Sequence, residues 1–371
     1  MASTQALPET HRALVLSSTS SPPEVKTIPT PQQGPGSVVA HIEVVNVISF
    51  ANEIYNGTRM YPFPVPLVIG FSAIARVVAL GPDATKLKPG QLVFFETFVR
   101  GRDDPTCAFL MGIHEGYSEG SRTLMRGEWR DATLAEFAKL PMENCHVLNE
   151  DVLLGKLGYR MIDLQEMNRL LVPYGGLRDI DLKPGETIII SPATGPFGSA
   201  AVKVALSLGA KVIAMGRNID SLKRLQSAND RVEIVQITND VETDTKALQQ
   251  FGIIDAMLDI SPPEAAESTH IKSGILALRP SGRISLMGGI MGDLAIPHGA
   301  VMNKSLKIKG KFMYDREDVG GLIKLVEIGM LRLGEKDRQE AVSVFSLDEW
   351  EEAFQAAKEY SGTGKTAVIV P

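Results

Sequence analysis

The stretch TIIISPATGPFGSAAVKVALSLGAKVIAMG, residues 187–216, decides the fold of this 371-residue chain. An apolar run ends in the turn SPATGPFG (residues 191–198), and small alanines and valines follow it. Gly209 then ends that segment, and a second apolar run begins. Strand, turn, helix and strand in this order predict a βαβ unit of a parallel sheet.

The turn at residues 191–198 has the chemistry of a dinucleotide site. Glycines let backbone amides approach a pyrophosphate, and the N-terminus of the following helix adds its positive dipole end. ATGPFG departs from G-x-G-x-x-G at its first position, and such a match alone would more often be an ordinary turn. The flanking strands and helix favour the dinucleotide interpretation. The residues predicted to contact the cofactor here are Thr194, Gly195, Pro196, Phe197 and Gly198.

The end of the second strand indicates which dinucleotide binds. A site for NAD places a carboxylate about 20 residues beyond the glycine motif, on the ribose 2′-hydroxyl. This chain has Gly216, Arg217 and Asn218 there instead. Glycine leaves room for a 2′-phosphate and a guanidinium can pair with it, so NADP(H) is the predicted cofactor. Lys223 and Arg224 are more simply interpreted as a solvated helix face.

Outward from this unit the chain divides into two fold types, as its length of 371 residues also predicts. Upstream runs such as RALVLSS and SVVAHIEVVNVIS, with Pro/Gly clusters between them, predict strands and turns. Downstream, IDAMLDIS and GRISLMGG continue the parallel sheet, and KIKGKFMY is expected to leave it. The terminal run KTAVIV predicts a strand of the β-rich domain. The predicted fold is α/β, with a β-rich domain at 1–165 and 311–371 and a doubly wound parallel-sheet domain at 166–310.

Three further segments carry local predictions. Residues 100–130 are polar, glycine-punctuated and too long for an ordinary connection, which predicts an active-site or interface loop region. A helix is expected around residues 319–331. A second one is opened by the capping box SLDE, residues 346–349, and stops at Gly362.

The composition narrows the class of protein. Hydrophobic residues make up 44% and charged residues 22% of the chain, which suits globular cores. The net charge of −6 is spread along the chain, so nucleic acid is not an expected partner. Two cysteines cannot form a disulfide framework, and no segment reads as a leader or a membrane span. We expect a cytoplasmic protein with a small-molecule substrate and no membrane partner. The sequence does not decide whether the protein forms a homodimer.

Four segments in order resemble the medium-chain dehydrogenase/reductase superfamily over nearly the whole chain. They are NVISFANEIYNG, PLVIGFSAIARVVALGPDATKLKPGQLV, ATLAEFAKLPMENCHVL and the cofactor motif. The resemblance implies a GroES-like substrate domain joined to a Rossmann cofactor domain. It also implies cofactor contacts at Ser261 and at Met287, Gly288 and Gly289, which follow two of the predicted strands.

The resemblance also implies where a catalytic zinc would be held in the superfamily's zinc enzymes. The matching positions here are Ser49, Phe71 and Ser72, with no cysteine near Leu171. A structural zinc site would need four thiolates within residues 100–130, where the sequence has only Cys107. We therefore expect no zinc. SFANEIYNG is instead similar to the quinone and enoyl reductase branch, which works without metal.

Without a metal, negative charge that develops on a substrate oxygen needs a hydrogen-bond donor. Metal-free enoyl reductases of the superfamily place a tyrosine in the segment that matches Tyr61, although an aromatic plug in a Pro-rich turn is an equal alternative. The same resemblance makes Ser49 and Asn52 further candidates, and Tyr55 a weaker one.

Other motifs are interpreted as structural. His114-Glu115 has no second histidine at helical spacing, and isolated histidines are mostly structural or surface groups. GTGKT near the C-terminus lacks the upstream glycine of a phosphate loop, and Cys145 is expected in a core.

Two functions stay open on the sequence alone. The favoured one is a zinc-independent oxidoreductase that moves hydride from NADPH to an activated C=C, C=O or C=N bond of an apolar small molecule. The alternative is a cofactor-binding protein with a structural or sensing role and no turnover.

Overall fold

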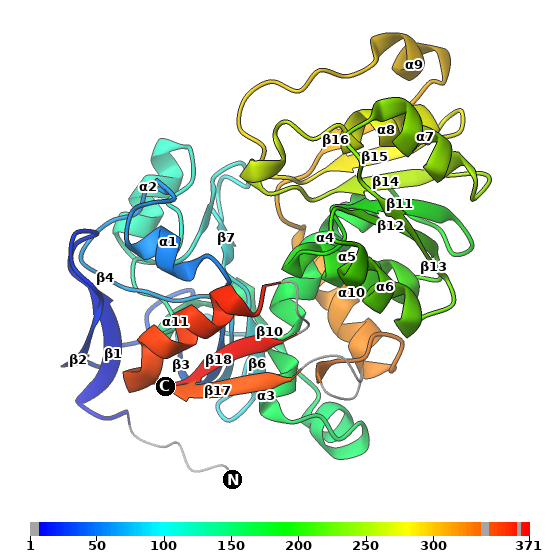
Figure 1. The fold of residues 1–371 in the computed structure, drawn as a ribbon. Helices are drawn as coiled ribbons and strands as arrows, with labels where there is room; N and C mark the ends of the chain where they lie inside the picture. Colours follow the sequence, from blue (N-terminus) through cyan, green and yellow to red (C-terminus); the bar gives the residue numbers. More distant parts are fainter. Residues whose placement is uncertain (1–6, 335–340, 362–364) are drawn as a thin grey trace. The chain divides into compact units, whose positions relative to one another are not determined.

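The computed structural model describes residues 7–334, 341–361 and 365–371, and they form two compact units (Figure 1). The first unit comprises the described residues within 1–168 and 332–371, and the second comprises residues 169–331. The second unit therefore extends beyond the predicted boundary at residue 310. It does so because helix α10 (Arg316–Glu327) pairs its buried Asp318 with Arg178 of α4 (Met167–Asp179), which precedes the parallel sheet.

The first unit is β-rich, as its β-branched runs predict. Its largest sheet has the strand order β10-β6-β5-β3-β18-β17, with β9 also paired to β3. A smaller sheet has the order β2-β1-β4, and β7 pairs with β8. The strands are β1 (Thr10–Leu16), β2 (Glu24–Pro29), β3 (Ser37–Val47), β4 (Leu67–Val68), β5 (Ala73–Leu80), β6 (Leu92–Phe95), β7 (Phe98–Arg100), β8 (Ala108–Leu110), β9 (Phe137–Pro141), β10 (Cys145–Val147), β17 (Val342–Ser346) and β18 (Thr366–Val370).

The helices of the first unit are short and lie outside its sheets. The longest, α11 (Trp350–Glu359), contacts β18, and its Phe354 ring stacks on Tyr55 of α1. The others are α1 (Ala51–Tyr55), α2 (Glu119–Arg126), η1 (Met142–Asn144), η2 (Asp151–Lys156), α3 (Met161–Leu164) and η5 (Leu347–Glu349).

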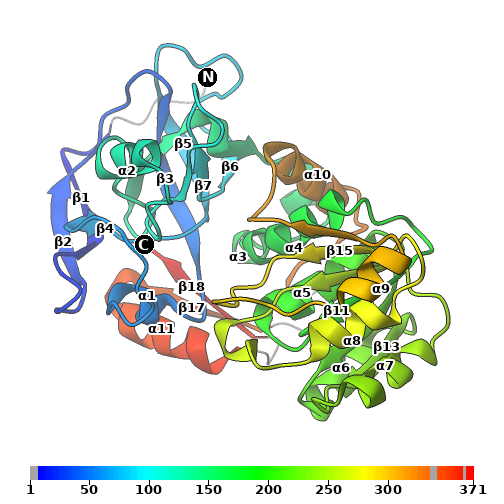
Figure 2. The same ribbon diagram turned by 90° about the horizontal axis from the view of Figure 1, so that it is seen from above.

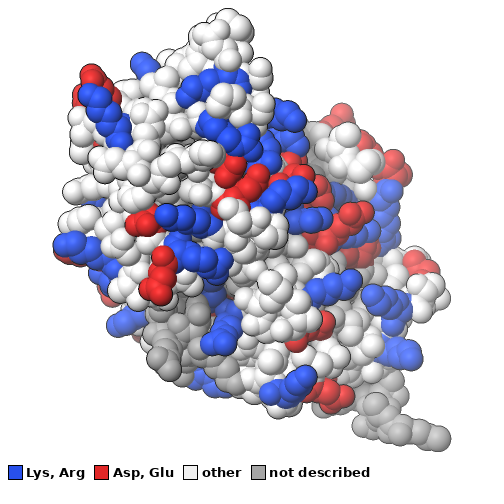
Figure 3. All heavy atoms as spheres, turned by 90° about the vertical axis from the view of Figure 1, so that its right-hand side faces the viewer, with Lys and Arg blue, Asp and Glu red and all other residues white. Residues whose placement is uncertain are grey.

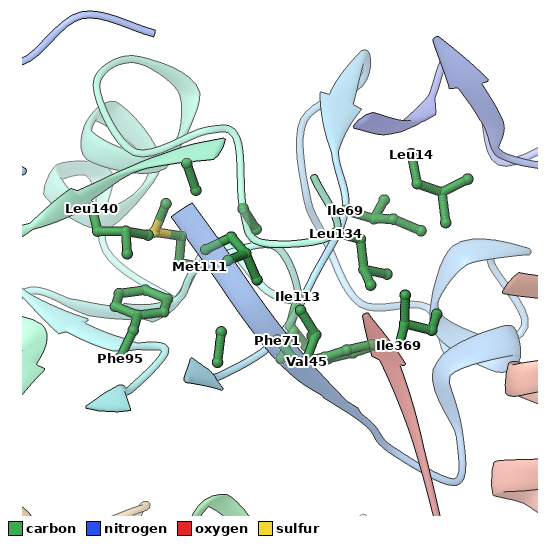
Figure 4. Packing of buried hydrophobic residues seen from close by; sticks show 14 of the residues in the cluster. Leu14, Val45, Ile69, Phe71, Phe95, Met111, Ile113, Leu134, Leu140 and Ile369 are labelled. Carbon is green, nitrogen blue, oxygen red and sulfur yellow. The ribbon is translucent and has the colours of Figure 1, made fainter. Parts of the chain in front are cut away.

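The core of the first unit joins segments that are far apart in the sequence. Figure 4 shows Val45 of β3, Phe71, Ile113 and Ile369 of β18 close together. Strand β18 pairs antiparallel with β3, which confirms that the C-terminal run belongs to the β-rich unit. The capping box at Ser346 is present as predicted, whereas the predicted stop at Gly362 lies outside the described residues.

Residues 100–130 are more ordered than their composition suggests. Strands β7 and β8 form a hairpin, and Ser118 caps α2, whose Ser121 and Met125 are buried. The predicted loop thus contains regular structure at β7, β8 and α2, which the sequence did not reveal because the apolar residues that anchor it are spaced too widely to form a recognisable pattern. Its role in an active site or interface stays a prediction.

The second unit is a Rossmann-like parallel sheet with the strand order β13-β12-β11-β14-β15-β16. Figure 1 shows α7 and α8 on one face and α4, α5, α6 and α10 on the other, and Figure 2 shows the same unit turned by 90°. The strands are β11 (Thr187–Ser191), β12 (Lys211–Gly216), β13 (Val232–Gln236), β14 (Ala256–Asp259), β15 (Arg283–Leu286) and β16 (Lys307–Gly310). The remaining helices are α5 (Pro196–Ser207), α6 (Ile219–Ala228), α7 (Val241–Gln249), η3 (Pro263–Ala265), α8 (His270–Ala277) and α9 (His298–Asn303).

Strand β16 corrects the prediction that KIKGKFMY leaves the sheet. Its residues Lys307–Gly310 pair in parallel with β15 and form the edge of the sheet. An edge strand carries exposed lysines more readily than a central one. The alternating lysines of β16 therefore make it less apolar than the inner strands, and its sequence did not indicate a strand of this sheet.

Charged residues of the second unit gather at the end of the sheet where the strands begin. Glu186, just before β11, pairs with Arg283, and Asp255, just before β14, pairs with Arg279 at 2.6 Å. On the face drawn in Figure 3, Lys/Arg and Asp/Glu side chains are interspersed. Within the described ranges, no helix has the length and hydropathy to cross a membrane.

Candidate functional site

The turn after β11 forms a cradle that requires glycine at position 198. Gly195 caps α5 and Pro196 is its first residue, where proline is favoured. A Cβ on Gly198 would lie 2.0 Å from the Pro192 carbonyl oxygen, so the helix packs directly on the turn. A Cβ on Gly195 would meet nothing within 4 Å. The N-terminus of a 12-residue helix thus opens onto free space, which is how helices bind phosphates.

The end of β12 lies beside this cradle. A Cβ on Gly216 would lie 3.0 Å from Thr194 Cγ2, so the two predicted turns are in contact. Arg217 is exposed, and in the described part of the chain its guanidinium has no hydrogen bond or ion pair. Asn218 has a structural task as well, because its Oδ1 caps α6 by accepting from the Ser221 amide at 3.0 Å.

Lys223 and Arg224 are exposed on α6. This placement agrees with their interpretation as a solvated helix face.

A buried hydrogen-bond network follows β14. His270 is fully buried. Its Nε2 atom lies 2.8 Å from the Ser261 hydroxyl and 3.2 Å from Asp259 Oδ1. Its Nδ1 lies 2.8 Å from the Ser268 hydroxyl. Sequence reasoning found Ser261 but missed this network, because His270 is nine residues further on and reaches back only once α8 has formed.

The network holds the β14 turn against the β15 turn. The Gly289 amide donates to the Ser261 carbonyl at 2.7 Å, and a Cβ on Gly288 would lie 2.5 Å from Asp259 Oδ2. The predicted cofactor residues of four strands therefore meet at the carboxyl end of one parallel sheet. This is the end where ligands bind in open α/β sheets.

The predicted catalytic residues of the first unit surround α1. Ser49 and Tyr61 are partly exposed and Asn52 is exposed. The Tyr61 hydroxyl has no hydrogen-bond partner in residues 7–334 or the two shorter described ranges.

Tyr55 is a different case from Tyr61. Its hydroxyl donates to the carbonyls of Gly112 (3.1 Å) and Gly70 (3.3 Å) and accepts from the Gly70 amide (3.2 Å). Burial raises the pKa of this phenol. The prediction of Tyr55 as a reserve catalytic group was wrong, because its hydroxyl is fully used by the fold.

The positions that would hold a catalytic zinc carry side chains with other tasks. Phe71 is 1% exposed and lies in the buried cluster of Figure 4. The Ser72 hydroxyl is buried and accepts from the Thr97 amide at 3.2 Å. Zinc is bound in proteins by thiolate, imidazole and carboxylate groups, so the side chains at these positions do not fit it.

The two cysteines are both buried. Burial raises the pKa of the Cys145 thiol, whose Sγ lies 3.5 Å from the Pro141 carbonyl oxygen, as expected of a core residue.

A stack of rings and one guanidinium runs beside α1 and includes Tyr61. The Arg59 guanidinium lies 3.9 Å from the centre of the Phe50 ring and 5.4 Å from that of Tyr61. The Tyr61 ring meets His114 edge-on at 5.1 Å, and Tyr117 lies 5.0 Å beyond His114. The sequence analysis interpreted His114 as structural, because only the folded chain brings it next to Tyr61.

Fold and cradle together define a two-domain protein in which a GroES-like domain accompanies a Rossmann-like domain. Comparison with protein families agrees with this class. Residues 34–150 match the alcohol dehydrogenase GroES-like domain, and residues 196–327 match the zinc-binding dehydrogenase family. The chain belongs to the medium-chain dehydrogenase/reductase superfamily.

Similar proteins are oxidoreductases. The chain is 27% identical over 340 residues to an L-threonine 3-dehydrogenase of Ruegeria pomeroyi, covering 89% of this chain and 91% of that protein. A cobalt- and zinc-bound thermostable alcohol dehydrogenase from Pyrobaculum aerophilum has a TM-score of 0.72 at 18% identity, covering 98% and 100% of the two chains. A crotonyl-CoA carboxylase/reductase has a TM-score of 0.77 at 13% identity, covering 98% and 89%.

Proposed function

We propose that this protein is a zinc-independent, NADPH-dependent oxidoreductase that reduces a polarised double bond in an apolar small molecule. The observation that carries the proposal is the cradle around Gly195 and Gly198, with the Arg217 guanidinium, which has no partner among the described residues, on the adjacent turn. Bound NADPH would supply a hydride, and the chain's residues would hold the cofactor and stabilise the charge that forms on the substrate.

Several groups support cofactor binding. The first amides of α5 can bind a pyrophosphate, and the close contact between Gly216 and Thr194 brings the end of β12 next to them. An unpaired guanidinium is suited to a 2′-phosphate, which it can bind with two parallel hydrogen bonds.

Zinc independence is proposed from the side chains at the matching positions. Phe71 has no metal-binding atom, and the Ser72 hydroxyl is already hydrogen-bonded inside the first unit. We therefore assign the stabilisation of negative charge to hydrogen-bond donors of the first unit, with Tyr61 as the leading one and Ser49 and Asn52 as alternatives.

The function is tested by NADPH oxidation against a panel of enones, quinones, imines and aldehydes. We expect turnover with at least one class. Tight NADPH binding with no turnover across the panel would favour the alternative, a cofactor-binding protein with a structural or sensing role.

Cofactor choice is tested at Arg217. We expect NADPH to bind at least about tenfold more tightly than NADH, because a charge-assisted pair contributes about 1.5–3 kcal/mol and a factor of ten is about 1.4 kcal/mol. Arg217→Asp should abolish or reverse this preference, whereas Lys223→Asp on the solvated face of α6 should change it much less. Equal dissociation constants in the unaltered protein would contradict the NADP(H) assignment.

A further inference from the structure

His114 belongs to a backbone arrangement that ties it to the segment of Tyr61. Its amide and its carbonyl both bond to Leu110 at 2.9 Å, and the next amide, of Glu115, donates to the Pro62 carbonyl at 2.8 Å. Pro62 follows Tyr61 directly. The ring contact between Tyr61 and His114 is therefore supported by the main chain on both sides.

The same turn fixes the position of the proton on the imidazole. The Gly116 amide donates to His114 Nδ1 at 2.9 Å, so Nδ1 is an acceptor and carries no proton. Gly116 has φ +73°, and a Cβ there would lie 2.2 Å from the Ala108 carbonyl oxygen. Only glycine can make this turn, and the turn leaves the single ring proton of a neutral imidazole on Nε2.

The Nε2–H group is left without a partner. Neither a hydrogen bond nor an ion pair engages it in the described ranges, although the residue is only 8% exposed. Nδ1 of His11 is fully enclosed and has no hydrogen-bond partner, whereas Nε2 of His114 is not enclosed in this way. His114 thus keeps a free donor at the edge of the core, next to the free hydroxyl of Tyr61.

Burial favours the neutral form of His114, because it lowers the pKa of the imidazole. The neighbouring Glu115 and the backbone of His114 itself act in the opposite direction. Glu115 is itself paired with Arg126 at 2.8 Å and with Arg122 at 3.7 Å, both from α2. The rings of Tyr61 and Tyr117 also contact the imidazole.

We propose that His114 is a second catalytic hydrogen-bond donor, which binds the carbonyl oxygen of the substrate through Nε2–H beside the Tyr61 hydroxyl. This inference rests on the proposed function and narrows its substrate class to carbonyl compounds. A neutral imidazole is a good donor but a poor acid, so it suits an oxygen that gains negative charge and does not suit an imine that must be protonated.

The electron balance is simple for an unsaturated carbonyl substrate. Hydride forms a C–H bond at the β-carbon, the C=C π bond breaks, and the electron pair moves to the carbonyl oxygen as an enolate. Tyr61 and His114 stabilise this oxygen, and water then provides the proton that completes the saturated product. Bound NADPH would supply the two electrons of this step as hydride.

Two isosteric substitutions separate a donor role from a structural role. His114→Asn places an oxygen where Nδ1 was, so it can keep the Gly116 bond, but it has no donor at Nε2. His114→Gln places an amide N–H near Nε2 and loses the Gly116 acceptor. We expect His114→Asn to lower the single-turnover reduction rate about 100- to 1,000-fold, as removal of one oxyanion donor does, and His114→Gln to lose less.

His11→Asn is the matched control. His11 is 4% exposed in the same unit, and burial lowers its pKa too, but its ring faces Phe137. We expect its substitution to leave the reduction rate unchanged. A double variant with Tyr61→Phe should lose less than the product of the two single losses, because both donors bind one oxygen.

Nitrogen NMR of the histidine rings tests the tautomer without any activity. We expect His114 to show an unprotonated Nδ1 and a protonated Nε2 at neutral pH. A protonated Nδ1 would overturn the inference, as would an active protein in which His114→Asn reduces its substrate as fast as His11→Asn or faster than His114→Gln. Absence of turnover in the unaltered protein would instead contradict the proposed function, and the donor role would fall with it.

Discussion

Two tyrosines only six residues apart show how much one hydroxyl depends on its surroundings. The Tyr55 hydroxyl is hydrogen-bonded to the backbone of Gly70 and Gly112, whereas the Tyr61 hydroxyl has no partner in the described residues. The same change of Tyr to Phe should therefore affect the reaction rate at Tyr61 and the stability of the fold at Tyr55.

Tyr61→Phe should lower the rate of hydride transfer about 100- to 1,000-fold and leave both NADPH affinity and thermal stability unchanged. Tyr55→Phe should lower the free energy of unfolding by about 1–3 kcal/mol, since it leaves buried backbone groups unpaired. Single-turnover NADPH oxidation and thermal unfolding, measured on both variants, check this. A Tyr61→Phe protein with a rate within about threefold of the unaltered one, at matched stability, would remove Tyr61 from the mechanism.

The lowered pKa of His114 predicts how stability depends on pH. The unfolded chain binds a proton near pH 6.5, and the folded chain does so only at lower pH because burial disfavours the charged ring. Between these two values the unfolded state holds more protons, so the free energy of unfolding falls as the pH falls. Above pH 6.5 this contribution is constant.

Replacing His114 by Asn should therefore reduce the loss of stability on acidification, as measured by urea unfolding across this pH range. His41, whose pKa is raised mainly by its hydrogen bond to Glu43, provides a contrast. Its folded form gains a proton more readily, so its substitution should make the acid-induced loss larger. Parallel curves for the unaltered protein and His114→Asn would refute the assignment of a neutral buried ring.

For single residues, the sequence could predict a position in the site where the residue acts together with its neighbours along the chain. Gly195, Gly198 and Arg217 could be placed because strand, turn and helix follow one another directly. His114 and His270 could not, since each gains its partners from segments that approach only after folding.

Among the elements, α5 and its preceding turn provide a direct test of the cradle. Gly195→Ala and Gly198→Ala add the same methyl group to two nearby backbone positions. At Gly198 the methyl would meet the Pro192 carbonyl at 2.0 Å, and at Gly195 it would enter open space.

We expect Gly198→Ala to lower the melting temperature of the second unit and Gly195→Ala to leave it unchanged. Both should weaken NADPH binding, the first by displacing the turn and the second by occupying space that a pyrophosphate needs. Calorimetry and fluorescence titration of NADPH measure the two effects separately. Unchanged NADPH affinity in Gly195→Ala would show that the ligand does not approach this turn.

The elements also mark the limit of periodicity as evidence. Inner strands such as β11 and β14 are continuously apolar because both of their faces are covered, and the sequence predicted them. Strand β16 is an edge strand with alternating lysines, and α2 is a short helix with two buried residues. Neither has enough apolar residues to differ from a loop by its sequence alone.

For the whole molecule, the proposed chemistry predicts its metal content. The purified protein should contain no stoichiometric zinc, and chelators should not change its reduction rate, because Phe71 and Ser72 provide no suitable ligand atoms. Elemental analysis after dialysis checks this. One tightly bound zinc per chain would overturn zinc independence and leave the family assignment intact.

The pairing of β18 with β3 has a consequence for how the chain is made. A ribosome delivers residues 169–331 as one continuous segment, so the second unit can fold as soon as it emerges. Strand β3 is synthesised long before that, and β9 can pair with its Ser37–His41 part, but its edge at Val45–Val47 stays open until β18 follows from residue 366 onward. The unit that starts first during translation is thus completed last, and in the interval the Val45–Val47 edge of β3 lacks its partner strand.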